Sequence, residues 1–257
     1  MVASPLVWTT LAGLSTGVGG VLAALCPPTR RLLAVSAGFA GGVMLAASLA
    51  DLVPEALRFY GQYLPPLSCG AALVSLLACG MVAAAALGRL LPDEAALAGR
   101  LAGDEARTAA LRTALITGTA LLLHNFPEGV LTLFAGTADP ALGVRTTLAI
   151  ALHNIPEGLA VAVPFAYALR SRLGGVVAAL ISGLAEPVGA VLALWCLQGW
   201  FTPGFLNGTV VLVAGIMLWV ALAQLMPSAL LERDRVVGLV GVAAGVLAML
   251  LGIAALP

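Results

Sequence analysis

Long apolar stretches alternate along the chain with short breaks that contain charged residues, Pro or Gly. A helix of about 20 apolar residues crosses roughly 30 Å of hydrocarbon, and each stretch reaches that length. Division at the breaks predicts eight membrane spans. The predicted spans are Leu6–Cys26, Leu32–Leu57, Pro66–Leu91, Thr113–Gly136, Gly143–Leu169, Leu173–Gly199, Phe205–Leu231 and Val236–Leu256. The pattern predicts an all-α polytopic membrane protein with residues 1–257 in a single transmembrane domain.

The composition narrows the class of protein. Hydrophobic residues make up 61% of the chain and charged residues 9%, whereas about 25% of the residues of a soluble domain are charged. The formal net charge is zero and no long basic run occurs, so no nucleic-acid partner is predicted. The lipid bilayer is the partner that the composition predicts.

The arginines predict how the spans are oriented. All twelve basic residues are Arg, and loops that face the cytoplasm carry an excess of positive charge. With eight spans, only Arg58 and Arg145 fall on one side. The ten on the opposite side are Arg30, Arg31, Arg89, Arg100, Arg107, Arg112, Arg170, Arg172, Arg233 and Arg235. This bias predicts that both termini lie outside and that the long polar connection, Pro92–Arg112, is a flexible cytoplasmic loop.

Two pairs of segments predict an internal repeat. Gly42–Leu57 resembles Gly215–Leu230 in one register, and Leu11–Leu25 resembles Ile181–Trp195 in a second register of nearly the same offset. In the predicted topology the members of each pair cross in opposite directions, which makes the repeat inverted. Inverted repeats are typical of alternating-access transporters. The alternative is that apolar helices rich in small residues resemble one another by composition.

The fourth and fifth spans carry the candidate chemistry. The motif HNFPEG begins at His124 and the motif HNIPEG begins at His153, and these are the only two histidines of the chain. Because an α-helix has 3.6 residues per turn, Glu128 shares a helix face with His124, and Glu157 shares one with His153. Asn125 and Asn154 lie three residues before these glutamates. Each span therefore offers a face with a nitrogen ligand and oxygen ligands.

A divalent cation explains why these residues lie inside the membrane. Ionisable side chains there cost several kcal/mol unless they are paired, and a cation neutralises two carboxylates at once. Imidazole, carboxylate and carboxamide groups suit zinc and neighbouring first-row metals. Glu186 in the sixth span offers a further carboxylate, and Met44 in the second span a thioether. The alternatives are a buried His–Glu pair that only joins two helices, and a Met44 that only fills the core.

These motifs resemble those of the ZIP (Zrt/Irt-like) family of divalent metal transporters, in its compact prokaryotic form. The resemblance rests on HNFPEG and HNIPEG, on GFAGGVMLAAS from Gly38 and on SGLAEPVGA from Ser182. It implies eight helices in a 3+2+3 arrangement and metal import across the cell (inner, cytoplasmic) membrane. It implies one metal position formed by Met44, His124, Glu128, His153 and Glu157. It implies an adjacent position formed by Asn125, Glu128, Asn154, Glu157 and Glu186.

Three features depart from the family pattern or leave alternatives open. The Pro92–Arg112 connection contains no His, so a metal-gathering loop is not predicted there. Gln224 and Ser228 stand in the seventh span, where relatives often have acidic residues. Asp51 and Glu55 flank Pro54 at the outer end of the second span, where they either attract cations or are solvated residues at a helix end.

Two other functions compete with transport. Zinc held by His and Glu can activate water, which would make an intramembrane hydrolase, but the chain has no H-E-x-x-H helix and its ligand set leaves little room for a catalytic water. A structural or partner-binding membrane protein would not need metal. The ligands do not rank zinc against iron, manganese, cobalt or cadmium, and the sequence is compatible with a homodimer. Zinc transport without a separate cofactor, and no enzyme activity, is the prediction.

Overall fold

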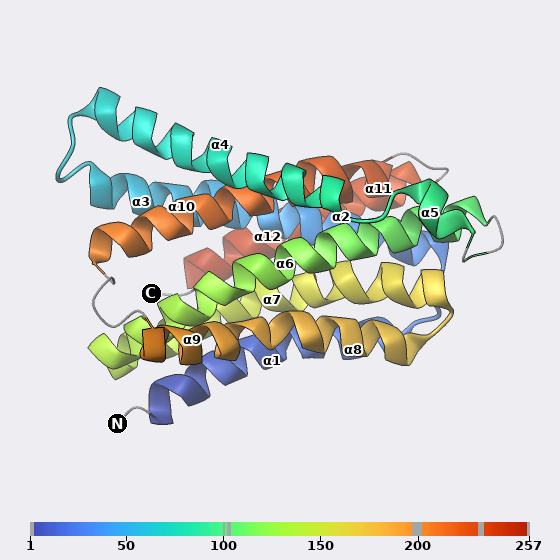
Figure 1. Ribbon diagram of the computed structural model, residues 1–257, viewed down its shortest axis with the longest axis horizontal. Helices are drawn as coiled ribbons and strands as arrows, with labels where there is room; N and C mark the ends of the chain where they lie inside the picture. Colours follow the sequence, from blue (N-terminus) through green and yellow to red (C-terminus); the bar gives the residue numbers. More distant parts are fainter. Residues whose placement is uncertain (1–2, 100, 102–103, 197–201, 231–233, 256–257) are drawn as a thin grey trace.

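The computed structural model describes residues 3–99, 101, 104–196, 202–230 and 234–255. This part of the chain is a bundle of long helices without strands (Figure 1). In chain order its helices are α1 (Ala3–Leu25), α2 (Arg30–Ala47), η1 (Ser48–Leu52), α3 (Val53–Tyr60), α4 (Pro66–Leu90), α5 (Glu94–Ala98), α6 (Glu105–Ala138), α7 (Pro140–Leu169), α8 (Arg172–Gly183), α9 (Ala185–Cys196), α10 (Pro203–Val220), η2 (Ala221–Leu225), α11 (Met226–Leu230) and α12 (Arg235–Ala255). The all-α class is confirmed.

Seven helical stretches of the described chain are long and apolar enough to cross a membrane. They are Pro5–Leu25, Arg30–Tyr60, Pro66–Leu90, Pro140–Leu169, Arg172–Cys196, Pro203–Leu230 and Arg235–Ala255. A polytopic membrane protein is therefore confirmed. The predicted fourth span, Thr113–Gly136, lies within α6 but is not among the seven, because its polar motif and several threonines lower its hydropathy. The predicted span ends Gly199, Leu231 and Leu256, and the counted Arg100 and Arg233, lie outside the described residues.

The connection predicted as a loop, Pro92–Arg112, is largely helical where it is described. Asp93 accepts a hydrogen bond from the Ala96 amide and begins α5, and Asp104 accepts one from the Arg107 amide and begins α6. Such caps satisfy backbone donors that a helix start leaves free. The extent of this loop was therefore predicted wrongly, because polar residues that start helices were taken as residues that interrupt them.

Two π-helical turns occupy matching places in the repeated segments. η1 (Ser48–Leu52) and η2 (Ala221–Leu225) are related by the same register that pairs Gly42 with Gly215 in the sequence repeat. In each, the amide just after the turn donates to the carbonyl five residues earlier, from Val53 to Ser48 and from Met226 to Ala221. One residue after each turn comes a proline, Pro54 or Pro227, and a π turn accommodates the missing proline donor. Similar composition alone would not place the same irregular turn twice.

Close helix contacts recur in the same register. Gly42 of α2 lies against the Val242 carbonyl of α12, and its repeat counterpart, Gly215 of α10, lies against the Leu77 carbonyl of α4. In both contacts an added Cβ would meet backbone, so glycine permits the close approach. The packing of α2 on α12 is thus repeated by that of α10 on α4.

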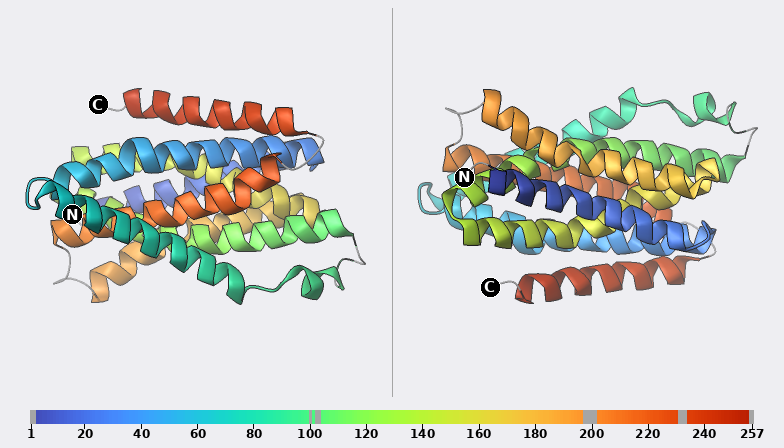
Figure 2. Two further views of the ribbon diagram at one scale, coloured as in Figure 1. Left: turned by 90° about the horizontal axis from the view of Figure 1, so that it is seen from above. Right: turned by 90° about the horizontal axis from the view of Figure 1, so that it is seen from below.

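The centre of the bundle is formed by α6 and α7. These two helices pack along each other, and α7 also packs on α1, α2 and α8 while α6 packs on α9 and α10. Figure 2 shows α12 at the margin of the bundle, alongside α2. In Figure 1, α1 begins and α12 ends at the same end of the bundle, and α5 and the start of α6 lie at the opposite end.

Candidate metal centre

A tight turn brings the two histidine motifs to the same level of the bundle. Asp139 ends α6 and begins α7, and its side chain accepts a hydrogen bond from the Ala141 amide at 2.9 Å. His124 precedes this turn by almost the same length of helix as separates the turn from His153. The two motifs must therefore face each other across the α6–α7 contact.

Each histidine pairs with the glutamate of the other helix. His124 Nε2 lies 3.1 Å from Glu157 Oε1, and His153 Nε2 lies 3.3 Å from Glu128 Oε1. None of the four side chains has more than 7% of its surface exposed. The sequence predicted that the His and the Glu of one motif share a helix face. The structure shows in addition that each His contacts the Glu of the other helix. Each pair thus joins a buried imidazole to a buried carboxylate, so that the two polar groups are partners of each other.

The two asparagines are anchored by the sixth and first spans. Asn125 Nδ2 donates to the Ser182 carbonyl at 3.1 Å, and Asn154 Nδ2 donates to the Ala12 carbonyl at 3.0 Å. Ala12 and Ser182 are counterparts in the register that aligns Leu11–Leu25 with Ile181–Trp195. Asn154 Nδ2 also donates to Glu186 Oε1. The contact of Asn125 with the sixth span therefore corresponds, under the repeat, to the contact of Asn154 with the first span.

Glu186 begins α9 and lies within this group. Its side chain is fully buried, and its carbonyl is so close to Gly129 that no Cβ would fit there. At the corresponding place, Gly158 approaches the carbonyl of Thr16, which the repeat aligns with Glu186. The structure thus brings the predicted third carboxylate to the two motifs, with Thr16 as its counterpart in the first span.

Several buried oxygens of these residues lack a hydrogen-bond partner. They are Glu128 Oε2, Glu157 Oε2, Glu186 Oε2, Asn125 Oδ1 and Asn154 Oδ1. A buried polar atom without a partner costs about 1–3 kcal/mol, so a fold that gathers five such oxygens needs a compensating group. Carboxylate and carboxamide oxygens suit a divalent cation. The donor set thus fits a metal.

The side chains are not yet placed around one ion. Within the described residues, no three His, Cys, Asp or Glu side chains form a ready metal-binding group. The reason is the pairing of each imidazole with a carboxylate, which directs the nitrogen of each histidine to one oxygen. Met44 is fully buried in the core cluster that contains Leu121 and Val161, each close in sequence to one of the motifs. These contacts agree with packing and leave ligation by Met44 as a prediction.

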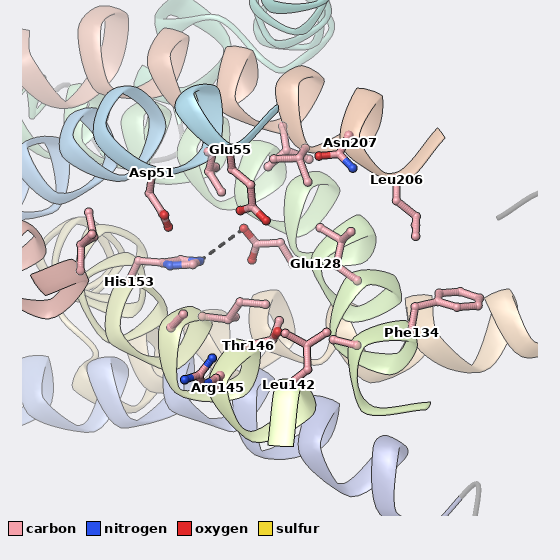
Figure 3. A pocket seen from close by; sticks show the side chains of 18 of the residues that line it. Asp51, Glu55, Glu128, Phe134, Leu142, Arg145, Thr146, His153, Leu206 and Asn207 are labelled. Atoms are coloured by element: carbon pink, nitrogen blue, oxygen red, sulfur yellow. Dashed lines mark ion pairs between the residues drawn. The ribbon is translucent and has the colours of Figure 1, made fainter. Parts of the chain in front are cut away.

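A cavity of about 1030 Å³ reaches one of the two pairs (Figure 3). Its lining includes His153 and Glu128 but not the other pair. Toward the end of the bundle where α1 begins, the lining includes Arg58 near the end of α3, Arg145 near the start of α7 and Asn207 near the start of α10. Among the described residues, the lining of this cavity therefore extends from the His153–Glu128 pair to that end of the bundle.

Sequence reasoning missed several residues of this region. It did not single out Asn207 and Thr146, which line the cavity, or the carbonyls of Ala12 and Ser182 that hold the asparagines. The repeat carried a signal for the last two, because it pairs Ala12 with Ser182. Cavity lining depends on helix rotation and had no such signal.

Comparison with known proteins agrees with the motifs. The family model described as ZIP Zinc transporter matches residues 91–254. The zinc transporter ZupT of Corynebacterium efficiens is 38% identical over 243 residues, which cover 91% of each chain. The zinc transporter ZupT of Chlorobium phaeovibrioides is 36% identical over 257 residues, which cover 96% of each chain. Since a family model matches more than half of the chain and relatives of this identity span nearly all of it, the chain belongs to the ZIP family.

Proposed function

We propose that this protein transports divalent metal ions across a membrane, with zinc as the main cargo. The observation that carries the proposal is the pair of crossed His–Glu contacts in the centre of the bundle, surrounded by buried oxygens without partners. Membership of the ZIP family and similarity to zinc transporters over more than nine-tenths of the chain support it. The protein is a transporter and not an enzyme, and the intramembrane hydrolase has no supporting observation.

The proposed topology has eight spans in a 3+2+3 arrangement, with α6 as the additional span. An even number of crossings agrees with α1 beginning and α12 ending at one end of the bundle. The matching π turns and the matching contacts in both repeat registers support an inverted repeat of spans 1–3 and 6–8. In this arrangement, the symmetry operation that relates spans 1–3 to spans 6–8 also relates α6 to α7. The arginine bias puts both termini outside the cell membrane.

The proposed metal centre has two adjacent positions that share both glutamates. One uses Met44 and the two histidines with the shared glutamates, and the other uses Asn125, Asn154 and Glu186 with them. The crossed pairs support this proposal because either glutamate already reaches the opposite helix. Metal binding would then exchange each His–Glu contact for contacts to the ion, so that small side-chain rotations suffice.

The cavity supports import. With both termini outside, the cavity opens at the outer end of the bundle and reaches His153 and Glu128, whereas it does not extend past them. This arrangement corresponds to a state that accepts metal from outside. Release on the cytoplasmic side then requires a second state, which the inverted repeat would supply by exchanging the roles of its halves.

Uptake by reconstituted vesicles tests the proposal. Wild-type protein should carry zinc into the vesicles, and the variants Glu128→Ala and Glu157→Ala should not, because each loses a shared ligand. Glu105→Ala is the matched control, since it removes an exposed glutamate at the start of the same α6. Unimpaired uptake by the first two variants would refute the proposed centre. Competition by iron, manganese, cobalt and cadmium in the same assay would rank the cargo.

A further inference from the structure

Two acidic residues distinguish the two halves of the repeat. Asp51 and Glu55 line the cavity, and their counterparts in the repeat are Gln224 and Ser228, which do not line it. Most other features of these segments match, including the π turn and the proline that follows it. The carboxylates are therefore not a general requirement of the repeated fold, and a role in the outer half alone would account for them.

The local fold directs both carboxylates into the cavity. Asp51 lies in η1 and Glu55 in the first turn of α3. Figure 3 shows the two side chains on the same wall, with Asp51 above His153 and Glu55 facing Glu128. No ion pair joins either of them to an arginine among the ion pairs of the described chain. Their carboxylates thus face the cavity, which Arg58 and Arg145 also line.

A second observation comes from the floor of the cavity. Glu128 has 4% of its surface exposed and lines this cavity, and its Oε2 atom has no hydrogen-bond partner. A buried carboxylate oxygen without a partner, in a cavity that two further carboxylates line, is stabilised by a cation that binds there. This oxygen is independent of the two acidic residues on the wall and points to the same class of ligand.

We propose that Asp51 and Glu55 form a capture site for a hydrated divalent cation, in the cavity next to His153 and Glu128. The inference deepens the proposed function and rests on it. Oxygen ligands alone suit a cation that keeps several waters, whereas the imidazoles below suit a first-row metal that has lost them. The cation would first bind between the wall carboxylates and then move to Glu128 and His153. The neutral Gln224 and Ser228 would offer no such site in the other half, so capture would favour one direction.

Replacement of the pair by its own counterparts tests this step. The double variant Asp51→Gln, Glu55→Ser gives the outer half the side chains of the inner half, and the double variant Asp51→Asn, Glu55→Gln removes only the charges. In vesicle uptake we expect a KM for zinc about 10-fold to 100-fold higher in both, the range seen when groups around a metal site are removed, with kcat retained. Glu105→Gln on α6 is the matched control and should keep the wild-type KM.

Measurements at different ionic strengths distinguish a cation-binding site from a long-range electrostatic attraction of cations. A field that only attracts cations is screened beyond about 3 Å at 1 M salt, so its loss would matter little there, whereas a binding site keeps its effect. The increase in KM should therefore persist at high salt. An unchanged KM, or an increase that disappears at high salt, would overturn the proposal.

A binding measurement keeps the test independent of transport. Titration of detergent-solubilised wild-type protein with zinc should show one more bound ion than titration of the charge-neutral double variant. Equal stoichiometry would overturn the capture site. If wild-type vesicles take up no zinc, the proposed function fails, and this titration still decides the capture site by itself.

Discussion

Replacement of Gly129 by alanine tests the close approach of α6 and α9 beside the proposed metal centre. Gly129 lies one residue after Glu128 in α6, and a Cβ at this position would meet the Cα, C and O atoms of Glu186. These atoms belong to backbone and cannot rotate away, as the end of a side chain could. The Cβ would lie well inside the 3.4 Å at which ordinary van der Waals contact begins, so α6 and α9 must separate.

Two opposing terms set the size of the effect. Alanine favours a helix over glycine by about 1 kcal/mol, and extra volume in a packed core costs typically about 1–3 kcal/mol. Because the contact at Gly129 involves three backbone atoms, we expect the upper end of the cost and a net loss of about 2 kcal/mol. For a chain of this size that loss lowers the unfolding midpoint by roughly 4–8 °C.

The matched control is Gly70→Ala in α4, where nothing lies within 4 Å of the added Cβ. This variant should keep or raise the midpoint, since only the helix preference acts. Thermal unfolding of both purified variants in one detergent gives the comparison, and zinc binding measured alongside should weaken only in Gly129→Ala, which displaces Glu186. A Gly129→Ala protein as stable as Gly70→Ala would refute the packing argument at this site.

Three further predictions use other features. Met44→Leu and Met217→Leu conserve side-chain volume at two fully buried positions that the repeat pairs, so each should lower the free energy of unfolding by less than about 1.5 kcal/mol. Only Met44→Leu should weaken zinc binding. Equal zinc affinities of the two variants would show that Met44 has a packing role only. Arg170→Gly should raise stability by about 1 kcal/mol in thermal unfolding, because Arg170 has a left-handed backbone at φ 52°; a lower midpoint would show that its side chain outweighs the strain. Zinc affinity measured by titration should fall from about pH 7.5 to pH 5, since histidine ligands with a reference pKa near 6.5 must lose a proton to bind, and a constant affinity would contradict imidazole ligation.

The sequence predicted what depends on local pattern. Seven of the apolar stretches are helices of spanning length, because a span needs only length and hydropathy. It predicted that the motifs at His124 and His153 would face each other, which the hairpin at Asp139 produces. It could not predict that each histidine contacts the glutamate of the opposite helix. That choice depends on the rotation of α6 against α7, which helical spacing within one helix does not determine.

Helix-capping residues and irregular turns were the other features that the sequence pattern did not predict. Asp93 and Asp104 were treated as polar breaks, although an Asp followed by Glu is also a helix start. The π turn at Ser48–Leu52 carries no hydrophobic signature of its own, yet it affects which residues beyond it face the cavity. The role of Asp51 was therefore left between capture and solvation, and only the arrangement of side chains in the cavity favours capture.

The crossed pairs also give a reason why such a site could release its cargo. Removing a cation from carboxylates alone would leave bare charges in a dry interior, at a cost of several kcal/mol. Here Glu128 and Glu157 each have an imidazole within 3.3 Å, so in the proposed centre a departing ion would be replaced by a partner that is already in place. In the proposed centre, binding and release would then be an exchange of partners for Glu128 and Glu157, and the free energy of the metal-free state would stay close enough to that of the bound state for the ion to move on.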